Sequence, residues 1–332
     1  MQKAPCLPLS DESIARAADL LRGGGLVAFP TETVYGLGGD ARNAAAVAGI
    51  FAAKGRPAFN PLISHVASAS EAFALGIETP AARRLADAFW PGPMTLILQR
   101  APNCPIASLT SAGLERIALR VPAHEGARRL LQEFGGPVAA PSANPSGRIS
   151  ASRAAHVMAG LGEAIDMVLD GGPCSNGVES TVIDTSGTQA VILRPGGVTR
   201  DAITRCLAAG GLSLMPATPD GANPDRPDRP DRPVSPGQLE SHYAPHAGLK
   251  MNVTAIEDDM ELIGFGPIAG AGRLRLTLSA SGDDSEAAAN LFDMLHAADG
   301  TGAGMIGVAP VPDSGLGEAI NDRLRRAAAP RK

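Results

Sequence analysis

The sequence is poor in aromatic residues and contains no long apolar segment. Aromatic side chains make up 3% of its 332 residues, so we expect a core built mainly from aliphatic side chains and alanine. No stretch approaches the roughly 18 consecutive apolar residues that identify a transmembrane helix. The initial residues, MQKAPCLPLSDES, lack the apolar segment of a signal peptide. Together these absences predict a cytoplasmic protein.

Cysteine is also scarce, and its spacing excludes two common uses. The chain has four cysteines that lie far apart and never form a CxxC pair. This spacing argues against a zinc ribbon and against the dense disulfide framework of small secreted domains. It fits a protein of the reducing cytoplasm. The four positions are Cys6, Cys104, Cys174 and Cys206.

The chain has no excess of positive charge and lacks several well-known catalytic motifs. Its formal net charge is −5 at pH 7, whereas non-specific binding of RNA or DNA requires clustered lysine and arginine. This balance does not exclude a local basic cleft. The motifs GxxxxGK[ST], GxGxxG after a strand, HExxH and GxSxG are absent, which removes the main support for P-loop, dinucleotide-binding, zincin and serine-hydrolase functions.

What is present is an ordinary globular composition with alternating strands and helices. Hydrophobic residues make up 44% and charged residues 19% of the chain, whose length suits one large and one small domain. Alternation of helices and short strands up to about residue 212 is typical of an α/β domain. The expected helices cover residues 10–23, 43–53, 80–90, 125–134, 150–161 and 199–209, and the expected strands cover 26–29, 62–66, 94–98, 117–121, 138–140, 167–170, 181–184 and 191–194.

The composition changes after this domain. Residues 215–236 are rich in proline and contain a threefold Asp-Arg-Pro repeat, which can neither bury a core nor sustain regular structure. Because such a segment is extended, at about 3 Å per residue, it can act as a tether across a domain surface. Beyond it we expect strands at 251–255, 262–265, 274–278 and 305–309, with helices at 285–298 and 317–328. The predicted division is an α/β domain at 1–212, a linker at 213–246, and a small α/β domain at 247–332.

Residues 29–65 carry polar side chains at the ends of two predicted elements. Residues 30–33 follow an apolar strand and residues 54–57 follow a helix, and loops on a rigid scaffold often carry binding residues. There, Lys54, Arg56 and Asn60 could hold phosphate or carboxylate oxygens in a fixed array. The alternative is that the two cations are surface charges that compensate the helix dipole.

Three further polar turns follow short apolar strands. Residues 139–147, rich in Ser, Asn and Gly, offer hydroxyls and backbone N–H groups to anions. Residues 177–182 and 193–197 repeat the pattern, although each is also an ordinary turn sequence. The recurrence of four such turns in one domain predicts that they converge on a cleft.

Three histidines leave alternatives open. His65 at a strand end is either a ligand contact or a hydrogen-bonded residue of the core. His242 and His246 have the i, i+4 spacing of a metal pair, but Pro245 opposes the helix that would bring them together.

Eight motifs, taken together, resemble those of L-threonylcarbamoyladenylate synthases in their two-domain form, a YrdC-like domain plus a C-terminal extension. The motifs are PTETVYGL (30–37), KGRPAFNPL (54–62), FWPGPMT (89–95), LRVPAH (119–124), APSANPSG (140–147), GVESTV (177–182), LRPGG (193–197) and SPGQLESHYAPH (235–246). They occur in the family's order and lie within residues 10–246. The resemblance implies an α/β fold, with a twisted mixed sheet in the YrdC-like domain and a second, smaller Rossmann-like α/β domain.

The resemblance implies an enzyme that condenses L-threonine, bicarbonate or CO2 and ATP into threonylcarbamoyl-AMP and pyrophosphate. Mg2+ is expected as the cofactor that accompanies ATP and neutralises the leaving group. The product serves threonylcarbamoyladenosine modification of tRNA, so the expected partner is the threonylcarbamoyl transferase complex that acts on tRNA. Neither a membrane nor stable nucleic-acid binding is expected.

The resemblance also assigns residues to the two substrates and to the lid. The threonine would be surrounded by Thr33, His65, Arg120, Ala140 and Ser180, with Arg120 clamping its carboxylate. ATP would be held by Arg56, Asn60, Arg116, Ser142, Ser150 and Arg194, with Tyr243 closing over the nucleotide. Lys54, acting on phosphate or carbamate oxygens, and Arg56 are the expected catalytic residues, and no metal-ligating residue is expected.

Two departures and two alternatives qualify this interpretation. Gln238 and Ser241 stand where the family has methionine and a basic residue, which bears on the contacts of the closed lid. One alternative is a double-stranded RNA-binding module without catalysis, which the acidic charge balance disfavours. The other is a carbamoyl transferase of hydrogenase maturation, which should bring CxxC pairs that are absent here.

Overall fold

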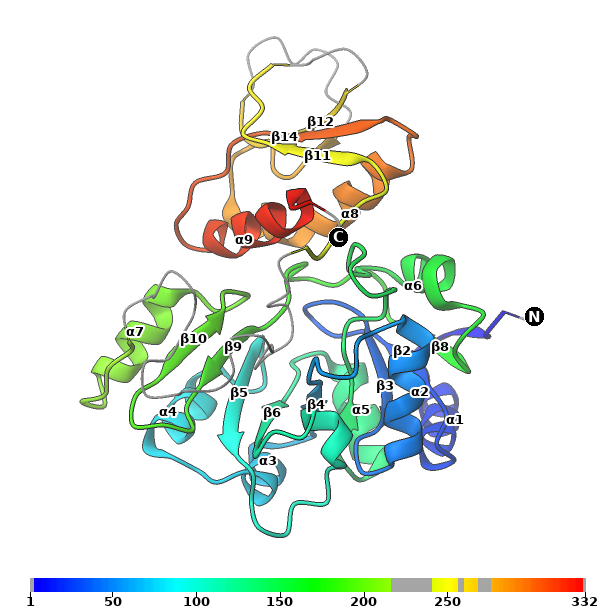
Figure 1. Cartoon of the computed structure of the whole chain (residues 1–332), viewed down its shortest axis with the longest axis vertical. Helices are drawn as coiled ribbons and strands as arrows, with labels where there is room; N and C mark the ends of the chain where they lie inside the picture. The colour runs from blue at the N-terminus through cyan, green and yellow to red at the C-terminus, as the bar shows by residue number, and fades with distance from the viewer. Residues whose placement is uncertain (1–2, 216–240, 256–259, 268–275, 331–332) are drawn as a thin grey trace.

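The chain forms two α/β units, which we call the first and second domains (Figure 1). The computed structural model describes residues 3–215, 241–255, 260–267 and 276–330. A mixed ten-stranded sheet organises the first domain, and a parallel four-stranded sheet organises the second. The two-part α/β fold expected from the sequence is therefore confirmed. The Asp-Arg-Pro repeat and Gln238 lie outside the described residues.

The large sheet has the strand order β1-β8-β2-β3-β7-β4-β6-β5-β9-β10. Neighbouring strands are parallel in the pairs β1–β8, β2–β8, β4–β6 and β5–β9, and antiparallel in the others. Strands far apart in the sequence thus become neighbours. The strands are β1 (Cys6–Pro8), β2 (Val27–Phe29), β3 (Gly36–Asp40), β4 (Ile63–His65), β5 (Met94–Gln99), β6 (Arg116–Arg120), β7 (Val138–Ala139), β8 (Met167–Asp170), β9 (Thr181–Asp184) and β10 (Val191–Arg194).

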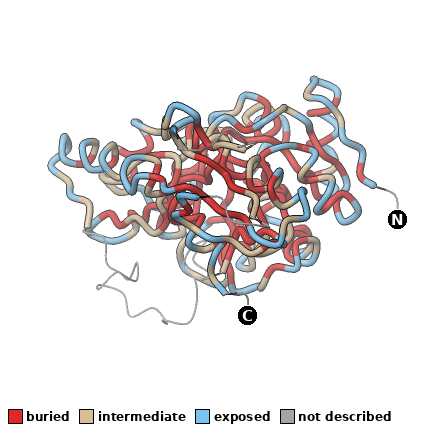
Figure 2. Tube along the Cα trace, turned by 90° about the horizontal axis from the view of Figure 1, so that it is seen from above, coloured by how far each residue is buried: buried red, intermediate tan, exposed pale blue. Residues whose placement is uncertain are grey.

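Helices cover both faces of this sheet, because successive residues of a strand point to opposite sides. On β2, Val27 and Phe29 pack with α1 and α5, whereas Ala28 belongs to the cluster that contains the other helices. Figure 2 shows the resulting buried residues concentrated in the interior and the exposed residues along the outer loops. The helices are α1 (Asp11–Arg22), α2 (Ala44–Lys54), α3 (Ala69–Leu75), α4 (Pro80–Phe89), α5 (Glu125–Phe134), α6 (Ala154–Leu161) and α7 (Arg200–Ala208), with a 3-10 turn, η1 (Ser108–Ser111).

Helix boundaries follow from local capping. Ser10 and Ser13 form a reciprocal capping box at the start of α1, with N–O distances of 2.9 and 3.1 Å, and such caps satisfy backbone donors that the helix leaves unpaired. The helix expected from residue 150 begins only at Ala154, with Arg153 as its N-cap. The first four residues of that prediction are therefore wrong: the Ser150 hydroxyl donates to Glu179, and the Ser152 hydroxyl lies 3.2 Å from Nδ1 of His156 in the helix.

The second domain places its two helices between its own sheet and the first domain (Figure 1). Its strands have the order β11-β14-β12-β13, and all their pairings are parallel. The strand expected at 251–255 lies instead at 248–251, where it pairs with β14. The elements are β11 (Gly248–Met251), β12 (Met260–Gly264), β13 (Leu276–Thr277), α8 (Asp284–Asp299), β14 (Met305–Val308) and α9 (Gly317–Ala328).

A polar contact joins α8 to the first domain. Arg153 donates to both carboxylate oxygens of Asp293, at 2.6 and 2.8 Å. The rings of His156 and His296 stack with centroids 3.8 Å apart, and Nε2 of His296 lies 3.1 Å from the carbonyl oxygen of Ser150. The second domain is thus held against the segment that precedes α6.

Candidate functional site

The loop after α2 carries the first buried cation of the site. Gly55 ends the helix in the left-handed region, at φ 61°, and turns the chain so that Arg56 faces inward. The Arg56 guanidinium donates to the carbonyl oxygens of Asn60 and Pro61, at 3.3 and 3.0 Å. Burial lowers the pKa of Arg56 to about 10, so the group remains charged at neutral pH. The loop therefore places a positive charge in an environment that is largely shielded from solvent.

Strand pairing places a second cation beside a histidine. In the parallel register of β4 and β6, His65 lies opposite Arg120. Both side chains are buried, and burial, followed by the charge of Arg120, holds the pKa of His65 well below its usual range. His65 is therefore neutral at pH 7, and its Nδ1 has no hydrogen-bond partner among the described residues.

Arg120 is held on three sides. It donates to Thr33 Oγ1 at 2.9 Å and to the Gly92 carbonyl oxygen at 3.3 Å. Its Nη2 lies 2.7 Å from Glu32 Oε1, an ion pair in which both side chains are less than 10% exposed. These contacts fix the guanidinium before any ligand arrives, which favours bidentate binding of a carboxylate.

The antiparallel pair β9–β10 brings a third cation to the same place. Arg194 donates through Nη2 to the Ser180 carbonyl oxygen at 2.8 Å and to its hydroxyl at 3.1 Å. That hydroxyl lies 2.8 Å from Thr95 Oγ1 on β5. The register shifts between Ile192 and Arg194, and such a bulge re-aims the side chains of a strand.

Together these residues surround one cavity of about 40 Å³. Nine of the residues assigned by the resemblance line it: Thr33, Arg56, His65, Arg120, Ala140, Ser142, Ser180, Arg194 and Tyr243. The remaining lining residues are Val34, Ile63, Pro141, Glu179 and His242. The polar turns that the sequence predicted to converge thus meet at the same cavity.

Residues just before the second domain form part of the cavity wall. Tyr243 is 1% exposed and has φ 64°, a left-handed conformation that is rare for residues other than glycine. Its neighbour Ala244 donates to the Gly147 carbonyl oxygen at 2.8 Å, and the His242 amide donates to the Arg326 carbonyl oxygen at 3.1 Å. The segment is thereby held between the two domains. Ser241 is only partly buried, and it does not line the cavity.

Four assigned residues lie outside the cavity lining. Lys54 is buried and donates to the carbonyl oxygens of Ser142, at 2.6 Å, and of Asn144. It therefore fastens the turn at 139–147 to the end of α2, and its burial excludes the alternative of a surface charge. Arg116, the first residue of β6, forms an ion pair at 3.1 Å with Asp184, the last residue of β9. Both strands pair with β5, which lies between them.

The other two are Asn60 and Ser150. Asn60 is fully buried, and neither atom of its amide has a hydrogen-bond partner among the described residues. Since buried amides are normally paired, it retains the capacity to bind a ligand. Ser150 donates to Glu179 Oε1 at 2.7 Å and so contacts the cavity wall through that carboxylate.

Sequence reasoning did not assign Glu179 or Glu32. Both lie within motifs that the sequence analysis singled out, GVESTV and PTETVYGL. The sequence signal that could have identified them is an acidic residue within a motif expected to meet several arginines. Burial by itself would raise the pKa of Glu179, but the charges of Arg323 and Arg194 outweigh it and lower that pKa to about 2. Glu179 is therefore ionised throughout the neutral range.

The structure separates the two histidines that had metal-pair spacing. His242 lines the cavity, whereas the exposed His246 lies 2.8 Å from Asp299. No group of three or more His, Cys, Asp or Glu residues within the described part of the chain could hold a metal ion.

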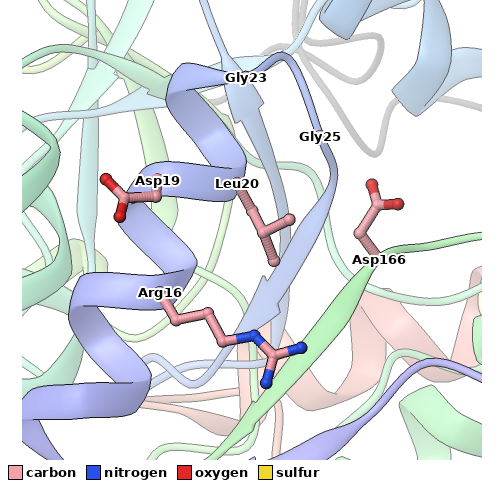
Figure 3. Close-up of a pocket in the computed structure, with 6 residues that line it drawn as sticks. All are labelled: Arg16, Asp19, Leu20, Gly23, Gly25 and Asp166. Carbon is pink, nitrogen blue, oxygen red and sulfur yellow. The ribbon is translucent and has the colours of Figure 1, made fainter.

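A second hollow lies at the C-terminal end of α1, and none of its lining residues belongs to the eight motifs. Figure 3 shows its lining residues, with Arg16, Asp19 and Leu20 on the helix and Asp166 opposite them. Asp166 Oδ2 accepts a hydrogen bond from the Leu26 amide at 2.7 Å, which joins the residues that directly precede β8 and β2. The first cavity is the better candidate site. None of the helices in the described ranges has the length and hydropathy needed to cross a membrane.

Comparisons with known proteins agree with this geometry. A family model of the Sua5/YciO/YrdC type, described as telomere recombination, matches residues 19–196, and the threonylcarbamoyl-AMP synthase C-terminal domain matches residues 198–329. The chain is 38% identical to threonylcarbamoyl-AMP synthase of Bacillus subtilis (98% of this chain, 95% of the relative). It is also 38% identical to the synthase of Pyrococcus abyssi (96% and 95%). A crystal structure of P. abyssi Sua5 complexed with L-threonine aligns with a TM-score of 0.86 and 36% identity, covering 98% of both chains.

Proposed function

Since the chain belongs to the family of two-domain threonylcarbamoyl-AMP synthases, we propose that it condenses L-threonine, bicarbonate or CO2 and ATP into threonylcarbamoyl-AMP and pyrophosphate. Relatives of that name match it over nearly its whole length, which makes it an ATP-using transferase. The finer statements below, on substrates and on individual residues, are part of the proposal.

One observation carries the proposal: three buried guanidinium groups, those of Arg56, Arg120 and Arg194, line a single small cavity together with serine hydroxyls. The three guanidinium groups outnumber the two buried carboxylates near them, Glu179 in the lining and Glu32 beside Arg120, so the cavity favours anionic ligands that form charge-assisted hydrogen bonds with arginine. Triphosphate and amino-acid carboxylate groups supply that negative charge.

The proposed chemistry has two steps. The threonine amine forms an N–C bond with CO2 and loses a proton, which gives a carbamate. A carbamate oxygen then attacks the α-phosphate in line, forming a P–O bond as the bond to pyrophosphate breaks. Such a transfer depends on positioning and on stabilisation of developing charge, which suits a site lined by cations and hydroxyls.

Arg120 and His65 are proposed to bind threonine. The fixed guanidinium of Arg120 would take the carboxylate, and the neutral His65 imidazole, with Nδ1 unpaired within the described residues, would accept or donate a hydrogen bond. Thr33, Ser180 and the backbone at Ala140 complete this side of the cavity.

Arg56, Ser142 and Arg194 are proposed to bind the nucleotide, with Asn60 and Ser150 next to them. Mg2+ would arrive as part of the Mg–ATP complex, because the described residues contain no cluster of three protein ligands for it and Mg2+ is commonly held by substrate phosphates and water. When bound, it would neutralise charge on the departing pyrophosphate. Lys54 would act by holding the turn that carries Ser142.

The lid has to move for ATP to enter. The cavity holds about 40 Å³, far below the roughly 300–1,000 Å³ of pockets that hold nucleotide-sized ligands. Withdrawal of Tyr243 and His242 would enlarge it, and their return would exclude water during the reaction. The product is proposed to pass to a threonylcarbamoyl transferase complex that modifies tRNA.

Pyrophosphate release tests this proposal. The purified chain should release pyrophosphate when ATP, L-threonine and bicarbonate are all present, and each omission should abolish the signal above background. Release that does not depend on threonine would contradict the proposal. Tight RNA binding with a steep salt dependence, without threonine-dependent release, would favour the binding-module alternative.

A further inference from the structure

We propose that Arg323 of the second domain is a positioning residue of the ATP site, acting through Glu179 on the cavity wall and Tyr243 on the lid; this inference rests on the proposed function.

Arg323 reaches the site from α9 although it lies 144 residues after Glu179 in the sequence. Its side chain is completely buried. Nε donates to Glu179 Oε2 at 2.8 Å, and Nη1 donates to Asp322 Oδ2 at 2.6 Å. The guanidinium carbon lies 5.4 Å from the centroid of the Tyr243 ring, a distance at which a cation is attracted to the ring face. One side chain therefore contacts the wall, the lid and its own domain.

Glu179 needs such a partner. It lines the cavity and its other carboxylate oxygen accepts a hydrogen bond from Ser150 at 2.7 Å. A carboxylate in this position repels a triphosphate unless a cation neutralises it. The pKa of Glu179 falls to about 2 because the charges of Arg323 and Arg194 outweigh the effect of burial. Arg323 thus shares with Arg194 the neutralisation of this carboxylate.

Removing Arg323 changes the net charge only around the residues proposed to bind the nucleotide. Glu179 would then rely on Arg194, and this interaction competes with the binding of a triphosphate to Arg194. The Tyr243 ring would at the same time lose the cation that it faces. No contact links Arg323 to Arg120 or His65 on the threonine side in the described residues. The consequence is a selective loss of ATP affinity.

The test uses the full chain with Arg323→Met, which keeps the volume of the side chain but removes its charge. ATP affinity is measured by calorimetric titration with Mg–ATP, and KM is measured separately for ATP and threonine. We expect the dissociation constant and KM for ATP to rise about tenfold to a hundredfold, as for loss of a hydrogen-bonded charge. The KM for threonine should stay within about twofold, a change too small to reflect a lost hydrogen bond.

Three further variants separate positioning from general destabilisation. Arg325→Met, an exposed arginine on the same helix, should behave as the wild type. Arg323→Lys should recover part of the ATP affinity, because it restores the charge without the planar fork. Glu179→Gln combined with Arg323→Met should also recover part of it, because no unpaired carboxylate remains.

Unchanged ATP affinity in a folded Arg323→Met protein would overturn the inference, and so would an equal rise of both KM values. If Arg323→Met does not fold, Arg323→Lys decides instead, since a rise in the KM for ATP alone supports the inference and an unchanged KM overturns it. Absence of pyrophosphate release from the wild type would refute the proposed function only. The titration with Mg–ATP would then still decide the role of Arg323.

Discussion

The carboxylate of Glu32 lies 2.7 Å from the guanidinium of Arg120, and both side chains are buried, although only Arg120 lines the cavity. Thr33 and the Gly92 carbonyl oxygen hold the same guanidinium from other sides. Through this ion pair Glu32 is placed to orient the residue that we propose to bind the threonine carboxylate.

Replacing Glu32 should impair threonine binding selectively. We expect Glu32→Gln to raise the KM for threonine about tenfold, because a neutral amide holds the guanidinium less firmly. The KM for ATP should stay unchanged, since the nucleotide side is built by other residues. Steady-state kinetics with each substrate varied in turn will measure both values. Glu12→Gln, at an exposed carboxylate on α1, is the matched control, and an unchanged threonine KM in Glu32→Gln would contradict the assignment.

Removing either nucleotide-side arginine should lower catalytic efficiency. Arg56→Ala and Arg194→Ala each delete charge-assisted contacts worth about 1.5–3 kcal/mol, so kcat/KM should fall roughly tenfold to over a hundredfold. Initial rates of pyrophosphate release at limiting ATP will measure the loss. Arg205→Ala, which removes an exposed arginine of α7, should have little effect. Near-normal kinetics in both cavity variants would refute the site.

Lys54 should matter for stability as well as for activity. Its ammonium donates to the carbonyl oxygens of Ser142 and Asn144, and Lys54→Met would leave both without this donor. We expect the free energy of unfolding to fall by about 2–4 kcal/mol, measured by urea titration. Lys54→Arg should lose less. Full stability combined with lost activity would instead indicate a direct phosphate contact.

Acid should weaken the contact between the domains. Burial, followed by the charge of His296, lowers the pKa of His156 to about 4, and burial also lowers the pKa of His296. Below about pH 6.5 the unfolded histidines gain protons that the folded pair does not. Stability supplied by the neutral pair is thus complete above pH 6.5 and is lost as the pH falls toward 4.

The size of this effect is on the order of 2 kcal/mol for His156, after allowance for its partial exposure. Urea titrations at intervals between pH 7 and 4 will measure it. His156→Gln should flatten the dependence relative to the wild type. Parallel pH profiles for the two proteins would show that the stacked pair does not titrate in this way.

Most elements of the fold could be predicted because apolar periodicity and capping residues are local signals. Strand β3 was missed because its sequence, Gly36-Leu37-Gly38-Gly39-Asp40, has three glycines and little strand propensity. Close packing explains the glycine at position 38. A Cβ there would lie 2.8 Å from the Phe29 ring and 3.0 Å from Val138, which is too close for a side chain. Glycine is therefore required in β3 by its packing against neighbouring strands, although glycine has a low propensity for strands.

The segments that form the site could be predicted from the sequence, but the directions of their side chains could be predicted only in part. The turns that converge were visible as polar segments after apolar strands, whereas the direction of Lys54, toward two carbonyl oxygens, depends on how the turn at 139–147 folds back. The ion pair between Glu179 and Arg323 had no sequence signal, since its members belong to different domains. Contacts of this kind follow from domain docking, which leaves no local pattern.

The position of Arg323 late in the sequence has a consequence for the order in which the cavity is completed during synthesis of the protein. The ribosome makes Glu179 well before Arg323, which follows 144 residues later, and domains generally fold in order of their emergence. During that interval Glu179 lies in the cavity lining of the nascent first domain without Arg323, its later ion-pair partner. The charge balance of the cavity is complete only when α9 docks, so, on the roles proposed above, a polypeptide that ends before α9 should bind ATP weakly.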